Sequence, residues 1–310
     1  MIKSITLRTC IGLYDQLRLI NKIYRNSPSQ GLDLKINYID SGELLQSPQK
    51  SIVLLHGFND NFSPFIPLVE HFRAKNIRVI APNLPDFSHT RQSNFTYWHS
   101  TIEKYYFLKD LLDRLNLKQI DCLVSHSFGI QACSALWEKP DDIEIKSVGM
   151  IAPQFFYEKI PTIYSNFLKS IMLFKGGLGS KFLEAIKFHK LSIFPFKFNT
   201  IDELFLMVCM AYDEQVPLKD AERRTESLKK LRIPGFILFG ENDNLISGKN
   251  KQRLHEILGI REKTIIDNDI SSIQFDSEEI KSIILKNAKH FPHLTHSDVI
   301  YSLIEKCINI

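Results

Sequence analysis

Residues 125–129, which read SHSFG, contain the serine that is best placed to act as a nucleophile. The apolar run at 120–124 predicts a short buried strand before it, and residues 130–136 favour a helix after it. A serine flanked by small residues between a strand and a helix is typical of a nucleophile elbow, where the tight turn lifts the hydroxyl above the sheet edge. The pattern therefore predicts Ser127 as a nucleophile and the amide of Phe128 as an oxyanion donor. The alternative is a chance match within a loop, since Ser125 stands where glycine is usual.

A second oxyanion donor is expected from the loop that follows the apolar run at 51–55. That run leads directly into His56 and Gly57, and a strand that ends in this way suits a loop whose backbone approaches the elbow. The amide of Phe58 is the expected donor in this loop. We expect His56 to support the loop rather than to react.

A carboxylate and a histidine follow two later strands. Residues 235–239 predict a strand, and Asp243 lies one short turn past its end, where a carboxylate could orient an imidazole. Residues 283–289 lead to His290, which would take the proton from the serine hydroxyl. His293 is an alternative base, but His290 is the first histidine after the strand. The chain order of serine, aspartate and histidine is the order expected when the serine stands on such an elbow.

With these four motifs at strand ends and in this order, the chain resembles the α/β-hydrolase superfamily, in its serine-hydrolase branch. The resemblance covers about residue 34 to the C-terminus. It implies a mostly parallel, doubly wound sheet with helices on both faces and a helical cap inserted above the active site. It also implies that Ser127, Asp243 and His290 form a catalytic triad. Residues 83–90 depart from the pattern that relatives carry there, and the fold hosts many chemistries, so the subfamily and the substrate stay open.

The composition fits one large α/β domain with an insertion. The chain has 310 residues, of which 44% are hydrophobic and 24% are charged, as in ordinary globular proteins. The net charge of +4 is too small to indicate nucleic-acid binding, and no apolar run approaches the ~20 residues of a membrane-spanning helix. The five cysteines match neither a disulfide framework nor a zinc site, and no signal peptide is recognisable. We therefore expect an intracellular, most simply cytoplasmic, protein without a bound metal.

We expect three parts along the chain. Residues 1–31 would form an N-terminal extension, whose basic bias also suits a mitochondrial targeting helix or a surface helix or strand before the domain. Residues 32–154 and 232–310 would form the hydrolase core. Residues 155–231 would form the helical cap, because their aromatic and aliphatic residues recur at helical spacing. The polar stretch at 267–281 would form a surface excursion before the last strand.

Serine rather than aspartate at the elbow predicts attack on an acyl carbon and an acyl-enzyme that water then hydrolyses. The leading hypothesis is a cofactor-free esterase or lipase for an uncharged, apolar acyl ester. It depends on a predicted cap rich in aromatic residues, Phe155 among them, and on the lack of a basic cluster beside the catalytic motifs. The alternatives are a non-catalytic ligand-binding or scaffolding protein of the same fold, and a hydrolase of peptide or carbon–carbon bonds. The sequence does not indicate an oligomeric state.

Overall fold

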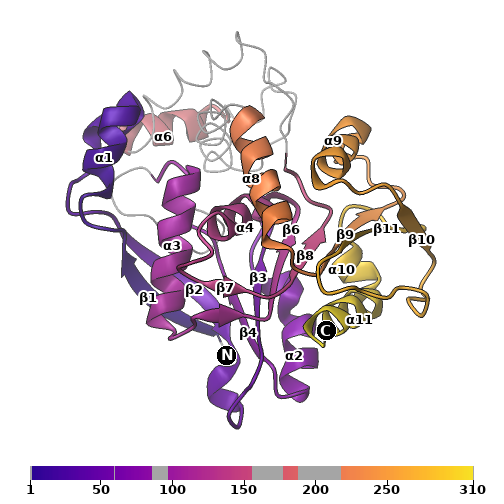
Figure 1. Ribbon diagram of the computed structural model, residues 1–310. Helices are drawn as coiled ribbons and strands as arrows, with labels where there is room; N and C mark the ends of the chain where they lie inside the picture. Colours follow the sequence, from indigo (N-terminus) through magenta and orange to yellow (C-terminus); the bar gives the residue numbers. More distant parts are fainter. Residues whose placement is uncertain (1, 59, 86–96, 156–176, 188–217, 310) are drawn as a thin grey trace.

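A nine-stranded sheet forms the centre of the protein in a computed structural model that describes residues 2–58, 60–85, 97–155, 177–187 and 218–309 (Figure 1). Its strands are β1 (Ile2–Arg8), β2 (Asp33–Asp40), β3 (Ser51–Leu55), β4 (Arg78–Pro82), β6 (Cys122–His126), β8 (Val148–Ile151), β9 (Gly235–Gly240), β10 (Lys263–Ile266) and β11 (Ile280–Leu285). Their order across the sheet is β1-β2-β4-β3-β6-β8-β9-β11-β10. The pairs β1–β2 and β2–β4 are antiparallel, and all other neighbours are parallel. The predicted mostly parallel α/β-hydrolase sheet is therefore confirmed.

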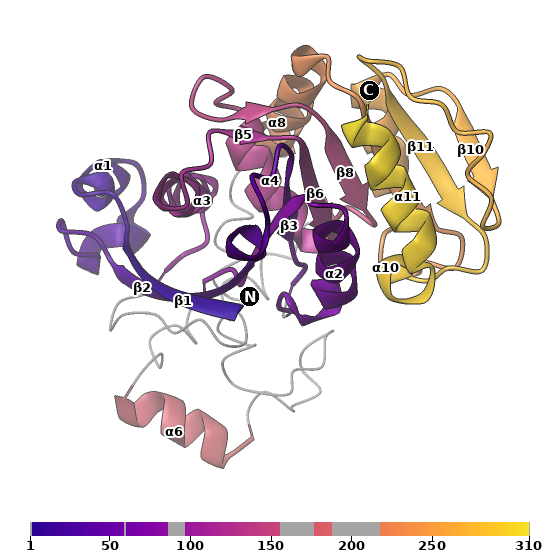
Figure 2. The same cartoon turned by 90° about the horizontal axis from the view of Figure 1, so that it is seen from below.

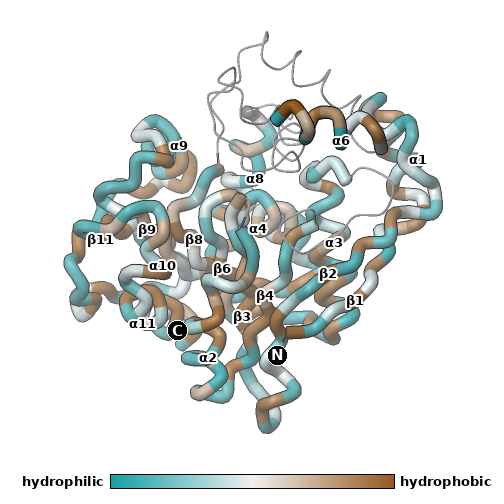
Figure 3. Tube along the Cα trace, turned by 180° about the vertical axis from the view of Figure 1, so that it is seen from behind, coloured by the Kyte–Doolittle hydropathy of each residue, from teal (hydrophilic) through white to brown (hydrophobic). Residues whose placement is uncertain are grey.

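Helices cover both faces of this sheet. They are α1 (Leu13–Ile20), α2 (Ile66–Ala74), α3 (Thr101–Arg114), α4 (Ile130–Trp137), α6 (Gly177–Ala185), α8 (Leu218–Leu231), α9 (Gly248–Leu258), α10 (Pro292–Thr295) and α11 (Ser297–Ile308). One core packs α1, α3, α4, α8 and α9 on the sheet, and a second core packs α2 and α11 on the opposite face (Figure 2). Strand β3 contributes to both cores, because Val53 belongs to the first core and Leu54 to the second. Burial on both faces explains why the four residues of this strand after Ser51 are all apolar, as its colour in Figure 3 shows.

The N-terminal segment belongs to the sheet, although the sequence interpretation set residues 1–31 apart as an extension. Strand β1 pairs with β2 over its whole length, from Ile2 opposite Ile39 to Arg8 opposite Asp33, and it forms one edge of the sheet (Figure 1). Helix α1 then buries three side chains against the first core. The buried carboxylate of Glu103 on α3 accepts a hydrogen bond from the hydroxyl of Tyr14 at 3.0 Å. This segment is thus part of the sheet and of its first core, although β1 is an edge strand whose residues are mostly exposed or half-buried.

The sequence interpretation also missed two strand pairings. Strand β10 has only four residues, and it pairs in parallel with β11 at the other edge of the sheet. Strands β5 (Gln119–Ile120) and β7 (Glu144–Ile145) form a separate two-stranded sheet. Segments this short carry too few alternations to stand out from loops. The residues between β10 and β11 contain no helix or strand, as expected of a surface excursion.

Two described helices fall in the range predicted to form the cap, but one of them, α8, contributes Ala221 and Leu228 to the first core and so packs on the sheet. Helices α6 and α8 lie in the range 155–231, and the described residues of this range contain no strand. The rest of the predicted cap lies outside the described residues, as does most of the departing stretch at 83–90. Among the described helices, none is long and apolar enough to cross a membrane. The described cysteines are all unpaired, and Cys122 and Cys133 are buried.

Candidate active site

Ser127 lies at a sharp turn between β6 and α4, with a one-turn helix η4 (Ser127–Gly129) linking the two. Its φ of 48° is in the left-handed region, which costs a non-glycine residue about 1–3 kcal/mol. Such strain is a known property of nucleophile elbows. The elbow also packs tightly on β3, because a Cβ added to Gly129 would lie 2.4 Å from the carbonyl oxygen of Leu55. Glycine at the last position of the motif is therefore required by close backbone packing.

The loop after β3 lies directly against the elbow. A Cβ added to Gly57 would stand 3.1 Å from the Cβ of Ser127, so the backbone here approaches the serine as closely as a glycine allows. The rings of Phe58 and Phe128 meet edge to face, with centroids 6.2 Å apart. The two residues predicted to donate to an oxyanion are therefore neighbours at the elbow.

His290 connects the serine to the carboxylate. Its Nε2 lies 2.9 Å from Ser127 Oγ, and its Nδ1 lies 3.0 Å from Asp243 Oδ2. A carboxylate accepts hydrogen bonds, so Nδ1 carries the proton, and the bare Nε2 accepts from the serine hydroxyl. The three residues follow the ends of β6, β9 and β11 and are 6–9% exposed. This arrangement can withdraw a proton from Ser127 and hold the resulting imidazolium against a carboxylate.

Asp243 is held in the charged form that this role needs. Its Oδ1 accepts hydrogen bonds from the amides of Leu245 at 2.9 Å and Ile246 at 3.4 Å. Burial by itself would raise the pKa of Asp243, but the hydrogen bond and charge of His290, with the two amides, hold this pKa below its ordinary value. The carboxylate is thus an anion fixed on three donors.

The other nearby histidines occupy supporting positions. His293, the alternative base, packs against Phe65 and His126 with ring centroids 5.3 and 4.4 Å away, and neither of its nitrogens has a hydrogen bond within the described residues. Burial lowers the pKa of His293 to about 4. The buried His56 donates from Nδ1 to the carbonyl of Gly57 at 2.8 Å and accepts at Nε2 from the amide of Leu84 at 2.9 Å. It therefore links the loops after β3 and β4, as expected.

Sequence reasoning missed two buried cations beside the elbow. Lys104 is 3% exposed, and its Nζ lies 5.2 Å from the centroid of the Phe128 ring. Arg224 on α8 is also 3% exposed. Lys104 lies on the buried face of α3 with Phe107 and Leu108, and this helical spacing was the signal that could have identified it. Within the described parts of the chain, no group of three metal-ligating side chains occurs.

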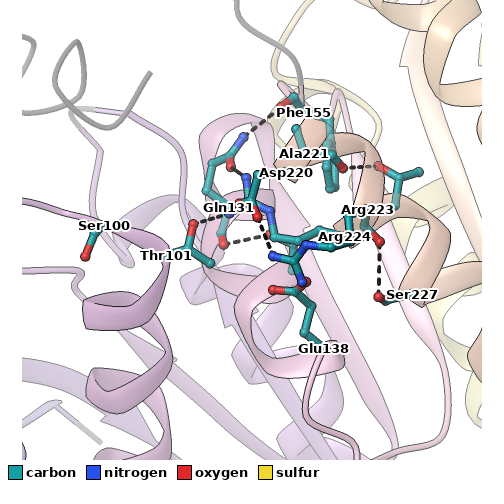
Figure 4. A network of polar contacts seen from close by, with 12 residues as sticks. Ser100, Thr101, Gln131, Glu138, Phe155, Asp220, Ala221, Arg223, Arg224 and Ser227 are labelled. Atoms are coloured by element: carbon teal, nitrogen blue, oxygen red, sulfur yellow. Dashed lines mark hydrogen bonds and ion pairs between the residues drawn. The ribbon is translucent and has the colours of Figure 1, made fainter. Parts of the chain in front are cut away.

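A polar network joins α8 to α4, the helix that follows the elbow (Figure 4). Arg224 donates from Nη2 to Gln131 Oε1 at 3.1 Å and from Nη1 to the hydroxyl of Thr101. Gln131 then donates to the carbonyls of Gln154 and Phe155, each at 3.0 Å. The network therefore joins the segment that follows β8 to α8, two parts of the described chain that are more than 60 residues apart in the sequence.

The same network reaches the serine. The amide of Gln154 donates to the carbonyl oxygen of Ser127 at 3.1 Å. Phe155, the first residue of the predicted cap, is 2% exposed and stacks on Trp137 with ring centroids 6.1 Å apart. Most of the residues predicted to form the cap lining lie outside the described residues, so that lining stays a prediction.

Comparison with known proteins agrees with this fold. A family model described as "Alpha/beta hydrolase of unknown function (DUF1057)" matches residues 16–309. The uncharacterized hydrolase YugF of Bacillus subtilis (strain 168) is 26% identical over 233 residues, which are 69% of this chain and 80% of that protein.

Two solved structures are similar over nearly their whole length. A thermophilic esterase from Thermogutta terrifontis has a TM-score of 0.62 at 13% identity, with 99% of this chain and 98% of that chain covered. Carboxylesterase CesB from Bacillus subtilis has a TM-score of 0.55 at 17% identity, with 99% and 92% covered. At these identities the likeness shows the fold alone. Because the family model spans nearly the entire chain, this protein belongs to the alpha/beta hydrolase family that the model describes.

Proposed function

We propose that this hydrolase is a serine esterase or lipase that cleaves uncharged acyl esters through Ser127, His290 and Asp243. One observation supports it most strongly. Ser127 has a strained backbone, and its Oγ lies 2.9 Å from Nε2 of His290, whose Nδ1 bonds the buried carboxylate of Asp243. The same arrangement of groups performs acyl transfer on several unrelated folds.

The first half of the reaction forms an acyl-enzyme. Ser127 Oγ attacks the acyl carbon while His290 Nε2 takes the hydroxyl proton. Asp243 stabilises the imidazolium that results and keeps its Nδ1–H in place. The tetrahedral intermediate then expels the alcohol, which receives the proton from His290. In the second half, His290 takes a proton from water while the water oxygen attacks the acyl carbon. The bond from this carbon to Ser127 Oγ then breaks, and His290 returns the proton to Oγ.

The oxyanion that develops on the acyl oxygen needs donors beside the elbow. We assign this role to the amides of Phe58 and Phe128, on the basis of their positions after β3 and within the one-turn helix η4. Removing one such donor in a serine hydrolase costs about 3 kcal/mol of transition-state stabilisation.

The ester class is supported by the similar solved structures rather than by a lack of basic residues, because Lys104 and Arg224 are buried near the elbow. The two similar structures are an esterase and a carboxylesterase, and these activities are known for those proteins only. An apolar acyl chain would gain about 0.8 kcal/mol per buried methylene. We therefore expect kcat/KM for p-nitrophenyl esters to rise from acetate to a medium chain length.

The test combines a chain-length series with covalent labelling. A fluorophosphonate should label the wild-type protein, and Ser127→Ala should abolish both labelling and turnover. Ser125→Ala is the matched control, because this second buried serine lies two residues away and should leave labelling intact. Labelling that survives in Ser127→Ala would overturn the assignment. Clean labelling without ester turnover would favour a peptide or carbon–carbon hydrolase, and the absence of both would favour a non-catalytic protein.

A further inference from the structure

The elbow makes a second contact with His290, through the residue that precedes the serine. His126 is the last residue of β6 and is 1% exposed. Its Nε2 lies 3.0 Å from the carbonyl oxygen of His290, a contact between positions 164 residues apart. A carbonyl oxygen can only accept a hydrogen bond, so Nε2 of His126 carries the proton. The elbow is therefore bonded to the backbone of the same residue whose side chain contacts Ser127.

The His126 ring is enclosed on all the sides that the structure describes. Its Nδ1 makes no hydrogen bond within the described residues and lies against the backbone of Gly57, where an added Cβ would stand 3.1 Å away. Ring centroids of His290, Phe291 and His293 lie at 5.0, 4.9 and 4.4 Å. These contacts hold the ring in one orientation, so its single donor points in one direction.

The charges around His290 fit this arrangement. Burial, reinforced by the neighbouring His293 and His290, holds the pKa of His126 well below its ordinary value. Burial also lowers the pKa of His293 to about 4. Both rings are therefore neutral near pH 7, and they add no positive charge beside His290. Asp243 bonds to His290 and not to these two rings.

We propose that His126 is a positioning residue for His290, an inference that deepens the proposed function and rests on it. With the bond to His126, both the side chain and the backbone of His290 are tied to the elbow. Without it, the loop that carries His290 could shift relative to Ser127 while β6 and β11 stay in place. A misplacement of about 1 Å can cost roughly 100-fold in rate. Because His126 does not contact the serine hydroxyl, its loss should lower kcat rather than raise KM.

Two substitutions separate the hydrogen bond from the packing. His126→Phe keeps an aromatic ring and removes the donor, whereas His126→Gln removes the ring and keeps a donor near the position of Nε2. The readouts are the second-order rate of Ser127 labelling by a fluorophosphonate, and kcat and KM for p-nitrophenyl butyrate. We expect His126→Phe to lower the labelling rate and kcat roughly 10- to 100-fold, with KM changed less than about twofold. His126→Gln should recover most of both losses.

His255→Phe is the matched control. His255 is also buried, its pKa is likewise lowered by burial to about 4, and its Nε2 bonds to the hydroxyl of Ser282 at 2.9 Å. It lies on α9, away from the elbow, so its substitution should lower Tm without changing the labelling rate.

The outcomes are distinguishable. Wild-type rates in His126→Phe would overturn the positioning role and leave the proposed function standing. If His126→Phe and His126→Gln lose labelling rate and kcat equally, and in proportion to their fall in Tm, His126 has only a packing role. That result would also overturn the positioning role. A wild-type protein in which no phosphonate labels Ser127 would overturn the proposed function together with this inference.

Discussion

Gly129 lies so close to Leu55 that a Cβ on the glycine would stand 2.4 Å from the leucine carbonyl oxygen. The contact joins the first turn after the nucleophile to the central strand β3, and backbone atoms on both sides prevent a small adjustment. The elbow therefore depends on a residue that takes no part in the chemistry.

Gly129→Ala should consequently move the elbow or unfold the domain. We expect a large fall in Tm and loss of fluorophosphonate labelling at Ser127. Gly248→Ala is the control, because no atom lies within 4 Å of its added Cβ and Gly248 does not have a positive φ. In that helix the change should be neutral or stabilise by up to about 1 kcal/mol. Normal labelling and Tm in Gly129→Ala would contradict the close packing.

Asp243→Asn tests the role of the carboxylate. Asparagine keeps the size of the side chain but cannot stabilise the imidazolium of His290, and it can favour the wrong tautomer of the ring. We expect kcat for an ester substrate to fall roughly 10³- to 10⁴-fold, as in other serine triads. Asp269→Asn, in the exposed loop before β11, should leave kcat unchanged. A loss of less than about tenfold in Asp243→Asn would show that this carboxylate is not the partner of the base.

Arg224 and its neighbour Arg223 should differ sharply in their contribution to stability. Arg224→Ala leaves the buried side-chain oxygen Oε1 of Gln131 without this donor, at about 1–3 kcal/mol, whereas water can replace the bond to the half-buried Thr101 hydroxyl. The side chain of Arg223 is 59% exposed and pairs with Glu138 and Asp220 at the surface, so Arg223→Ala should cost no more than about 1 kcal/mol. Urea unfolding of the two variants measures the difference. An equal loss of unfolding free energy in the two variants would mean that the buried network does not stabilise the packing of α8 on α4.

Acid should destabilise the protein below neutral pH. Burial lowers the pKa of His56, His255 and His293 from 6.5 to about 4, and it holds the pKa of His126 well below 6.5. Each imidazole binds its proton more weakly in the folded chain than in the unfolded chain. The contribution of these histidines to stability is therefore complete above pH 6.5 and is lost progressively as the pH falls toward 4.

The measurement is the free energy of unfolding in urea at several pH values between 7.5 and 4.5. His255→Asn removes one of these groups, so it should reduce the slope of stability against pH by roughly one proton. The same slope in the variant and the wild type would show that His255 does not titrate on unfolding.

Local patterns in the sequence were sufficient to predict most of the parallel strands, though not β10, and the three residues that meet at the elbow. The strand at 51–55 is recognisable because both of its faces are buried, which makes it a nearly continuous apolar run. Ser127 is recognisable because a tight turn admits only small neighbours. Asp243 and His290 are recognisable because each follows the end of such a strand.

Tertiary packing alone decided the rest. His290 and His293 are three residues apart and chemically identical, but Pro292 begins α10, and this turn carries His293 into contact with Phe65. The hydrogen bond between His126 and the His290 carbonyl joins residues 164 positions apart. The N-terminal strand could be placed only through its ladder with β2. These contacts depend on how distant segments pack, and that information is not contained in the spacing of residues along one element.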